Sequence, residues 1–214
     1  MIEKILPAEV AVAEARHDPP DAELFPEEEA VIVRAVAKRR REFTTVRFCA
    51  RRALAELGVP PAPILPGKRG APQWPAGVVG SMTHCEGYRA AVVARTGDVS
   101  ALGIDAEPHG PLPEGVLTIV TRPAELSGLA ALTASSPEVH WDRLLFSVKE
   151  SIYKAWFPLT GDWLGFEDAD VALSPDGSFS ARILLDPAGR PTGFTGRWLV
   201  ADGLVVSAVT ALAP

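Results

Sequence analysis

Apolar residues recur at helical spacing over residues 141 to 157, in the stretch WDRLLFSVKESIYKAWF. At about 100° per residue, one face of this segment collects Trp141, Leu144, Leu145, Val148, Ile152, Ala155 and Trp156. Lys149 projects into the same apolar sector, and Glu150 falls at its edge. The pattern therefore predicts a buried helix with two opposite charges at the margin of its buried face. Ser136 and Pro137 predict its start and Pro158 its end.

Shorter patterns predict the other elements. Pro26 and the glutamates after it begin a helix that continues, with a break near Lys38, to Leu57, where Gly58 stops it. Strands are expected at 78–82, 88–95 and 99–107, the last two joined by a turn at 96–98. The region 114–133 is ambiguous, with a short helix after Pro123. Four more strands are expected near 168–173, 179–185, 194–200 and 204–211.

The order of a helix followed by antiparallel strands occurs twice along the chain. This order predicts an α+β (α/β) fold of two similar subdomains with a pseudo-twofold relation. The N-terminal α/β half is expected at residues 1–108 and the C-terminal half at 109–214. Similarity between the two halves is too weak to establish a duplication.

Composition places the chain among ordinary globular proteins. The 214 residues are 47% hydrophobic and 22% charged. No basic start followed by an apolar run opens the sequence, and no stretch reaches the ~18 apolar residues of a membrane span. Cys49 and Cys85 are far apart and have no metal-binding or redox spacing. These features predict a soluble, cytoplasmic protein with free thiols.

Charge is concentrated in one segment. Residues 34–52 carry eight basic residues and one acid, a net +7, although the whole chain has a net charge of −6. An acidic protein with one cationic segment is a poor general nucleic-acid binder but suits a small polyanion such as a nucleotide. The basic face could be merely solvated. The charge density favours a ligand role for at least Arg47 and Arg52.

Two carboxylates share one face of a predicted strand in LGIDAEPHG. Alternation places Asp105 and Glu107 on the same side, ~7 Å apart along the chain. At roughly 6 Å and an effective dielectric near 20 they repel by ~3 kcal/mol, which a cation would remove. Oxygen ligands alone favour Mg²⁺. Solvation of both acids at a strand end is the plainer reading of a lone D-x-E motif.

Glu150 changes these odds because it offers a third carboxylate on a helix that must pack on a sheet. If that sheet ends in Asp105 and Glu107, three acids can share one metal. The alternative for Glu150 is a surface pair with Lys154, worth a few tenths of a kcal/mol. Lys149 argues for a ligand, because an ammonium in an apolar stripe must reach solvent or meet an anion.

Further polar groups suit a phosphate-rich ligand. Lys68 and Arg69 lie in the glycine-flanked loop PGKRGAP, and Thr83 and His84 lie just past a strand. Alone, His84 would more often be a structural histidine, and no other histidine has the spacing for a zinc site with it. The serine, cysteine and histidine residues also lack a nucleophile-elbow context, which disfavours covalent hydrolysis.

Together these residues resemble the Sfp/EntD-type 4′-phosphopantetheinyl transferases, in particular the branch of enterobactin synthetase component D. GIDAE (103–107) and FSVKESIYK (146–154) match the two signature motifs of that family. GKRGAPQWPAGVVGSMTH (67–84) and RREFTTVRFCARRAL (40–54) are similar to its loop and its basic helix. The resemblance runs from about residue 26 to 157. The loop here is longer than the G-K-P of the broader family, so either Lys68 or Arg69 takes the phosphate.

The resemblance implies an enzyme that moves 4′-phosphopantetheine from coenzyme A to a serine of an acyl or peptidyl carrier protein, releasing adenosine 3′,5′-bisphosphate. Mg²⁺, or Mn²⁺ in its place, would be held by Asp105, Glu107 and Glu150. Glu150, as ligand, base or both, and Lys154 would be catalytic. The nucleotide and its phosphates would be held by Arg47, Arg52, Lys68, Arg69, Thr83 and His84, with Lys149 and Lys154 steadying the pyrophosphate.

The residues are also compatible with two other functions. One is a coenzyme A or nucleotide sensor without transfer activity, and the other is a metal-dependent phosphohydrolase that uses the same acids. The expected partner is an acidic carrier protein that docks on region 110–135. No nucleic acid, no membrane and a monomeric state are expected. The pathway that the carrier serves, whether siderophore, polyketide, peptide or fatty acid, is left open.

Overall fold

The computed structural model describes residues 1–187 and 189–213. In the N-terminal part the elements are η1 (Ile2–Ile5), β1 (Ala11–Ala15), α1 (Pro26–Val31), α2 (Ala37–Glu56), η2 (Lys68–Gly70), β2 (Val78–Cys85), β3 (Tyr88–Arg95) and β4 (Val99–Pro108). They are followed by α3 (Val116–Val120), α4 (Pro123–Ser135), α5 (Trp141–Thr160), η3 (Phe166–Asp168), β5 (Ala169–Leu173), β6 (Ser178–Ile183), β7 (Gly193–Ala201) and β8 (Leu204–Leu212).

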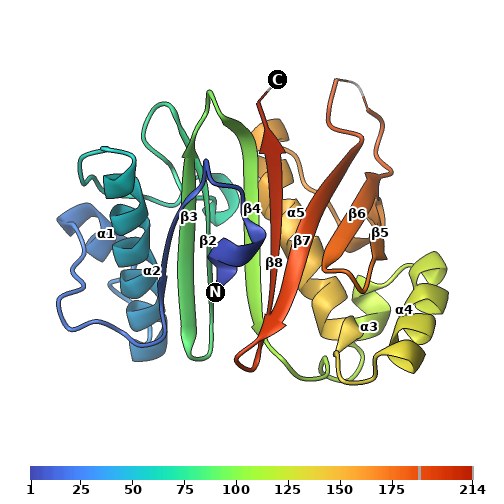
Figure 1. The fold of residues 1–214 in the computed structure, drawn as a ribbon. Helices are drawn as coiled ribbons and strands as arrows, with labels where there is room; N and C mark the ends of the chain where they lie inside the picture. Colours follow the sequence, from blue (N-terminus) through green and yellow to red (C-terminus); the bar gives the residue numbers. More distant parts are fainter. Residues whose placement is uncertain (188, 214) are drawn as a thin grey trace.

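Two antiparallel sheets form the framework of the molecule (Figure 1). The smaller sheet has the strand order β1-β3-β2, and the long helix α2 covers it. The larger sheet has the order β4-β8-β7-β6-β5, and α5 covers one of its faces, with α3 and α4 beside the far end. The predicted mixed α/β class is therefore confirmed, with one long helix on each sheet.

The two sheets meet where β2 lies beside β4, and side-chain hydroxyls join them. The Ser81 hydroxyl accepts a hydrogen bond from the backbone N–H of Ile104 at 3.0 Å, and the Thr83 hydroxyl accepts one from Ala106 at 3.1 Å. Since residue numbers rise together along both strands, β2 and β4 run in the same direction. The seam therefore brings the Thr83 side chain next to the strand that carries the predicted metal ligands.

The turn at 96–98 leads from one sheet to the other instead of closing a hairpin. Strand β4 pairs along its length with β8, and Asp105 lies opposite Ser207. The boundary predicted at residue 108 therefore falls directly after a strand that belongs to the larger, mostly C-terminal sheet. Such a pairing between strands about 100 residues apart leaves no local pattern in the sequence.

Helix α5 is the most deeply packed helix of the C-terminal part. Trp141, Leu144, Val148, Ile152 and Trp156 are buried in the core between α5 and the larger sheet, as their spacing predicts. The helix starts at Trp141, later than predicted, because Ser136 instead ends α4.

It also continues through Pro158 to Thr160. Proline lacks only one backbone donor, which the last turn of a helix tolerates, and Gly161 with a φ of 71° ends α5 in the left-handed conformation that glycine favours.

Three other expectations need adjustment. The break in the first long helix lies at residues 32–36, ahead of Lys38, and separates α1 from α2. Strand β1 was not predicted, since its sequence AVAEA is short and alanine-rich. The ambiguous region holds both α3 and the 13-residue α4. Within residues 1–187 and 189–213, none of the helices combines the length and apolar character that crossing a membrane requires.

Candidate functional site

A cavity of about 520 Å³ lies between the two halves of the chain, a size typical of small-molecule sites. Its walls come from four segments: the α1–α2 region, the loop 66–72, strand β2 and the last turns of α5. The lining residues with polar or aromatic side chains are Arg39, Phe43, Arg47, Arg69, Ser81, His84, Glu150, Tyr153, Lys154 and Phe157. The cavity thus brings basic groups from one half to an acid and a lysine from the other.

The basic wall is built by α2 and the end of β2. Arg39 lies with Nη1 2.7 Å from His84 Nε2. Because arginine can only donate, the imidazole accepts this hydrogen bond. Burial lowers the pKa of His84, although the nearby Glu42 opposes the shift. His84 is therefore an uncharged ring that holds the Arg39 guanidinium at the cavity wall.

Arg47 is the second arginine of this wall, and buried partners fix it in place. Its Nε donates to Ile64 O at 2.9 Å and lies 3.6 Å from a carboxylate oxygen of the fully buried Glu28. Its guanidinium stacks 3.2 Å from the centre of the Phe43 ring. Burial lowers the pKa of Arg47 to about 10, so the group keeps its charge at neutral pH.

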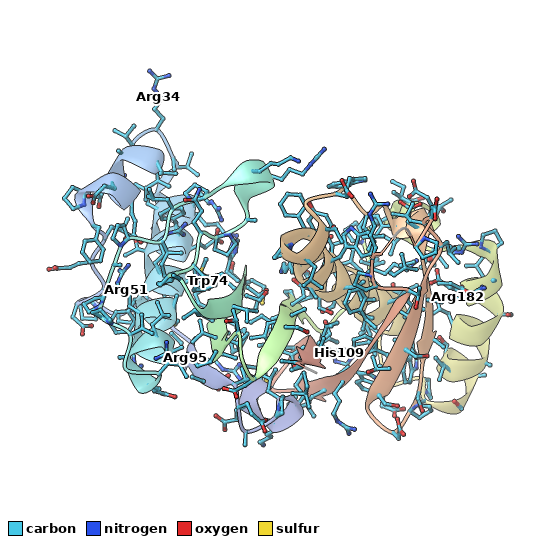
Figure 2. All side chains as sticks on the ribbon, turned by 90° about the horizontal axis from the view of Figure 1, so that it is seen from above. Arg34, Arg51, Trp74, Arg95, His109 and Arg182 are labelled. Carbon is cyan, nitrogen blue, oxygen red and sulfur yellow. The ribbon has the colours of Figure 1, made fainter. Side chains whose placement is uncertain are left out.

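The other arginines of the basic segment turn away from the cavity. Arg34 projects into solvent, and Arg51 lies on the outer side of the N-terminal half, far from the C-terminal half (Figure 2). Arg51 donates to Glu28 at 3.0 Å. Arg52 lies over the Phe48 ring and does not line the cavity. Only some of the basic residues in this segment therefore face the cavity, and its net charge overestimates the charge available to a ligand.

The glycine-flanked loop forms a short finger over the cavity. Its base is closed by a bridge between Pro66 and Pro72. The backbone of Arg69 has a φ of 55°, a value that residues other than glycine rarely adopt. Its guanidinium lies 4.9 Å from the centre of the Trp163 ring. Lys68 donates to Gly161 O at 3.0 Å. Of the two residues left open by the sequence, Arg69 lines the cavity.

The acidic groups lie on β4 and α5. Asp105 Oδ1 accepts from Lys154 Nζ at 2.7 Å and from the Thr83 hydroxyl at 3.3 Å. Glu107 pairs with Arg143 at 3.1 Å. Burial, reinforced by the charge of Asp105, raises the pKa of Glu107, and burial and Asp105 likewise raise the pKa of Glu150 while Lys154 opposes that shift. Asp105 therefore interacts electrostatically with both Glu107 and Glu150.

Asp105 provides the direct test of whether a metal ion fits these acids. Its Oδ2 is buried and has no hydrogen-bond partner in the part of the chain that the structure describes. An unsatisfied carboxylate oxygen beside further carboxylates suits a hard cation. Within the same residues, no group of three or more His, Cys, Asp and Glu side chains is arranged to hold an ion. Lys154 instead forms an ion pair with Asp105, and Arg143 forms one with Glu107.

A second cavity of about 180 Å³ adjoins the first, since Glu150 and Tyr153 line both. Lys149 also borders it, and its remaining walls are apolar and come from the segment 163–169. The Tyr153 and Trp163 rings lie 5.0 Å apart. An elongated ligand could thus place a charged end in the large cavity and an apolar end in the small one.

The structure therefore brings together five predicted residues from both halves: Arg47, Arg69, His84, Glu150 and Lys154. Five further predicted residues do not line this cavity: Arg52, Lys68, Thr83 and the two acids of β4, Asp105 and Glu107. The Thr83 hydroxyl is occupied at the sheet seam, where it supports Asp105.

Lys149 departs most from its expected place. Its ammonium group is buried against Glu125, Val120 O and Phe166 O, so the expected contact with pyrophosphate is not supported.

Sequence reasoning missed Arg39, Tyr153 and Trp163. Arg39 stands in a run of basic residues, among which the sequence offers no means of choosing. Tyr153 lies within the motif at 146–154 but carries no charge, and Trp163 follows the helix in a segment without periodicity.

A larger hollow of about 720 Å³ lies over the outer face of the larger sheet, and none of the predicted site residues line it.

A cavity of this size between the two halves, with arginines on one wall and Glu150 and Lys154 on the other, is typical of a site for a small phosphorylated ligand. Family models agree. The model of the 4′-phosphopantetheinyl transferase N-terminal domain matches residues 27–94, and that of the 4′-phosphopantetheinyl transferase superfamily matches residues 101–202.

Similar proteins cover most or all of the chain. The 4′-phosphopantetheinyl transferase Svp of Streptomyces mobaraensis is 56% identical, with 100% of this chain and 90% of that protein aligned. PptT of Mycobacterium tuberculosis, also a 4′-phosphopantetheinyl transferase, is 52% identical, with 98% and 97% aligned. Enterobactin synthase component D of Salmonella typhimurium is 31% identical, with 82% and 73% aligned.

The chain belongs to the 4′-phosphopantetheinyl transferase family and is an enzyme of that class. The resemblance seen in the two signature motifs is confirmed.

Proposed function

We propose that the enzyme transfers 4′-phosphopantetheine from coenzyme A to a serine hydroxyl of an acyl or peptidyl carrier protein. The observation that carries this proposal is the pair of adjoining cavities that meet at Glu150. Enzymes of this family use coenzyme A as substrate. Its nucleotide suits the basic wall, and its pantetheine arm suits the apolar slot beside Tyr153 and Trp163. The diphosphate then lies between them, next to Glu150 and Lys154.

The proposed nucleotide contacts follow from the cavity wall. Arg39, Arg47, Arg69 and His84 would surround the phosphates, with arginine favoured because its planar fork matches phosphate oxygens. Lys154 is 27% exposed and lines the cavity, so its ammonium can reach the diphosphate. Arg52, Lys68 and Thr83 would act indirectly, through α2, the finger and Asp105.

The proposed metal is Mg²⁺, with Mn²⁺ as the alternative, held by Asp105, Glu107 and Glu150. Support comes from the unsatisfied Oδ2 of Asp105 and from the raised pKa of Glu107 and Glu150, since a cation relieves the repulsion among the carboxylates. When bound, such a metal supplies charge neutralisation at the diphosphate.

The reaction is a phosphoryl transfer. The serine oxygen bonds to the phosphorus that carries the pantetheine arm, and the bond from this phosphorus to the bridging oxygen breaks, releasing adenosine 3′,5′-bisphosphate. Positioning and charge stabilisation supply most of the acceleration in such reactions. The serine proton would pass to the Glu150 carboxylate or to a water hydrogen-bonded to it, for which its raised pKa is suited. Lys154 would stabilise the charge on the leaving group.

The carrier protein is proposed to dock on region 110–135. Helices α3 and α4 expose apolar side chains there, with Ile119 71% and Leu126 48% exposed. These helices lie at the same end of the molecule as the start of α5 (Figure 1). We also propose that the enzyme is a cytoplasmic monomer that binds neither nucleic acid nor membranes. The pathway of its carrier stays open; among the relatives, one is named for enterobactin synthesis.

Mass spectrometry of carrier proteins tests the proposal. Incubating the enzyme with coenzyme A, Mg²⁺ and a panel of apo acyl and peptidyl carriers should add one phosphopantetheine to at least one carrier. Glu150→Gln should abolish the mass gain while leaving circular dichroism unchanged. Nucleotide binding without a mass gain on any carrier would favour a sensor, and release of phosphopantetheine to water without a carrier would favour a phosphohydrolase.

A further inference from the structure

Lys149 and Glu125 form an ion pair that is almost completely shielded from solvent. Lys149 Nζ lies 2.8 Å from Glu125 Oε2, and the two side chains are 1% and 2% exposed. The ammonium also donates to Val120 O and Phe166 O, each at 2.9 Å. All three of its hydrogens therefore have acceptors. The next residue along α5 is Glu150, which faces the cavity.

Glu125 connects this pair to further segments. Its Oε1 accepts from the backbone N–H of Val171 in β5 at 2.8 Å, and its Oε2 accepts from that of Arg122 at the start of α4 at 2.7 Å. Through one lysine, α5 is thus tied to the end of α3, to α4, to η3 and to the edge strand β5. Neither Glu125 nor its backbone partners line the large cavity.

This arrangement leaves Lys149 little capacity for a phosphate. A diphosphate could reach the ammonium only by displacing Glu125, which would leave a buried carboxylate unpaired, and such losses are strongly destabilising. Lys149 borders only the small cavity, and its ammonium hydrogens are already engaged, whereas Lys154 is partly exposed and lines the large cavity. The two lysines of the motif therefore occupy different environments.

We infer that Lys149 and Glu125 are positioning residues of the transfer reaction, which hold α5 in the one rotation that directs Glu150 and Tyr153 into the two cavities. Turning α5 by one residue, about 100°, would move both side chains off the cavity walls. Such a rotation would separate the Lys149 ammonium from its three acceptors, which lie on three different segments. The inference rests on the proposed function for its kinetic consequences.

Paired substitutions separate positioning from phosphate binding. Lys149→Met should lower kcat about 100-fold or more, because misplacement by ~1 Å has effects of that size. Affinity for coenzyme A, measured by isothermal titration, should stay within threefold. Adding Glu125→Gln should restore at least tenfold of the lost kcat, because the second change removes the unpaired carboxylate. Lys154→Met is the matched contrast on the same helix: it should weaken coenzyme A binding, and Glu125→Gln should not rescue it.

Glu125→Gln alone provides an independent check if Lys149→Met does not fold. This variant keeps every residue of the large cavity, yet it should lower kcat and denaturant resistance with coenzyme A affinity unchanged. The inference is overturned if Lys149→Met weakens coenzyme A binding more than tenfold at unchanged kcat. It is also overturned if the double variant shows no gain in activity or stability over the less stable of the two single variants. If the wild-type enzyme modifies no carrier, the proposed function fails. The unfolding free energies of wild type, the Lys149→Met and Glu125→Gln variants and the double variant still decide whether Lys149 and Glu125 act as a unit.

Discussion

Replacing Gly103 by alanine is expected to push helix α5 away from strand β4. A Cβ atom at this position would lie 1.9 Å from the carbonyl oxygen of Ser151 and 2.8 Å from the backbone nitrogen of Ala155. Ordinary contacts begin near 3.4 Å, so the helix would have to retreat by ~1.5 Å. Both neighbours are backbone atoms inside a helix, which cannot rotate aside. The strain therefore falls on the packing of α5 as a whole.

Two losses follow from that retreat. Overpacking of a close contact costs about 1–3 kcal/mol, and because the clash is with backbone we expect ~3 kcal/mol of unfolding free energy. Asp105 follows Gly103 by two residues and Glu150 precedes Ser151, so the same movement separates the two acids. A displacement of ~1 Å at a reacting centre reduces the rate about 100-fold.

Urea unfolding and carrier modification, measured side by side, test both losses. Gly97→Ala is the matched control, because Gly97 lies in the turn before β4, a Cβ there would meet nothing within 4 Å, and its φ lies outside the left-handed region. The control should behave as wild type. A Gly103→Ala enzyme that unfolds within about 0.5 kcal/mol of wild type and retains kcat/KM within threefold would refute the reasoning.

Other substitutions probe separate parts of the structure. Glu28→Gln removes the charge that Arg47 and Arg51 share in the interior and should destabilise the protein by about 3 kcal/mol in urea unfolding. Trp163→Ala removes a half-exposed wall of the small cavity and the stack with Arg69, so it should raise KM for coenzyme A several-fold with little change in Tm. Gly128→Ala in α4 meets no neighbour and should stabilise by about 1 kcal/mol, a Tm rise of about 2–4 °C. The pKa of Glu150 in the folded protein lies above the ordinary value of 4.5. The folded protein therefore loses stability as pH rises from the unfolded-state pKa of Glu150 through its folded-state pKa, because the carboxylate form is disfavoured by burial. Glu150→Gln should therefore match wild type below pH 4.5 and exceed it in urea resistance at neutral pH.

Local patterns predicted most elements of the fold, and non-local pairing escaped them. Period-two alternation located the strands of both sheets to within a few residues, except β1, whose alanine-rich sequence has little contrast between its faces. The pairing of β4 with β8 joins segments about 100 residues apart, and the seam between β2 and β4 depends on two hydroxyls, Ser81 and Thr83. No alternation of apolar and polar residues records such contacts.

Site residues could be predicted from the sequence where a charged or polar side chain is unusual for its place in a predicted helix or strand. Glu150, Arg47 and His84 were selected from the sequence, and they line one cavity. Arg39 was not separable from its basic neighbours, because exposure distinguishes them and exposure depends on tertiary packing. Arg52 was selected on charge density alone, and its guanidinium lies over Phe48 instead.

Helical geometry explains why the two lysines of FSVKESIYK divide their roles. Residues 150 and 154 differ by about 40° around the helix axis, so Glu150 and Lys154 face the same cavity. Lys149 and Lys154 differ by about 140°, so a ligand in that cavity cannot contact both from one side. The requirement that a buried ammonium meet an anion was correct. Its anion is Glu125, from a region whose fold the sequence left ambiguous, and this is why the motif alone could not assign the pair.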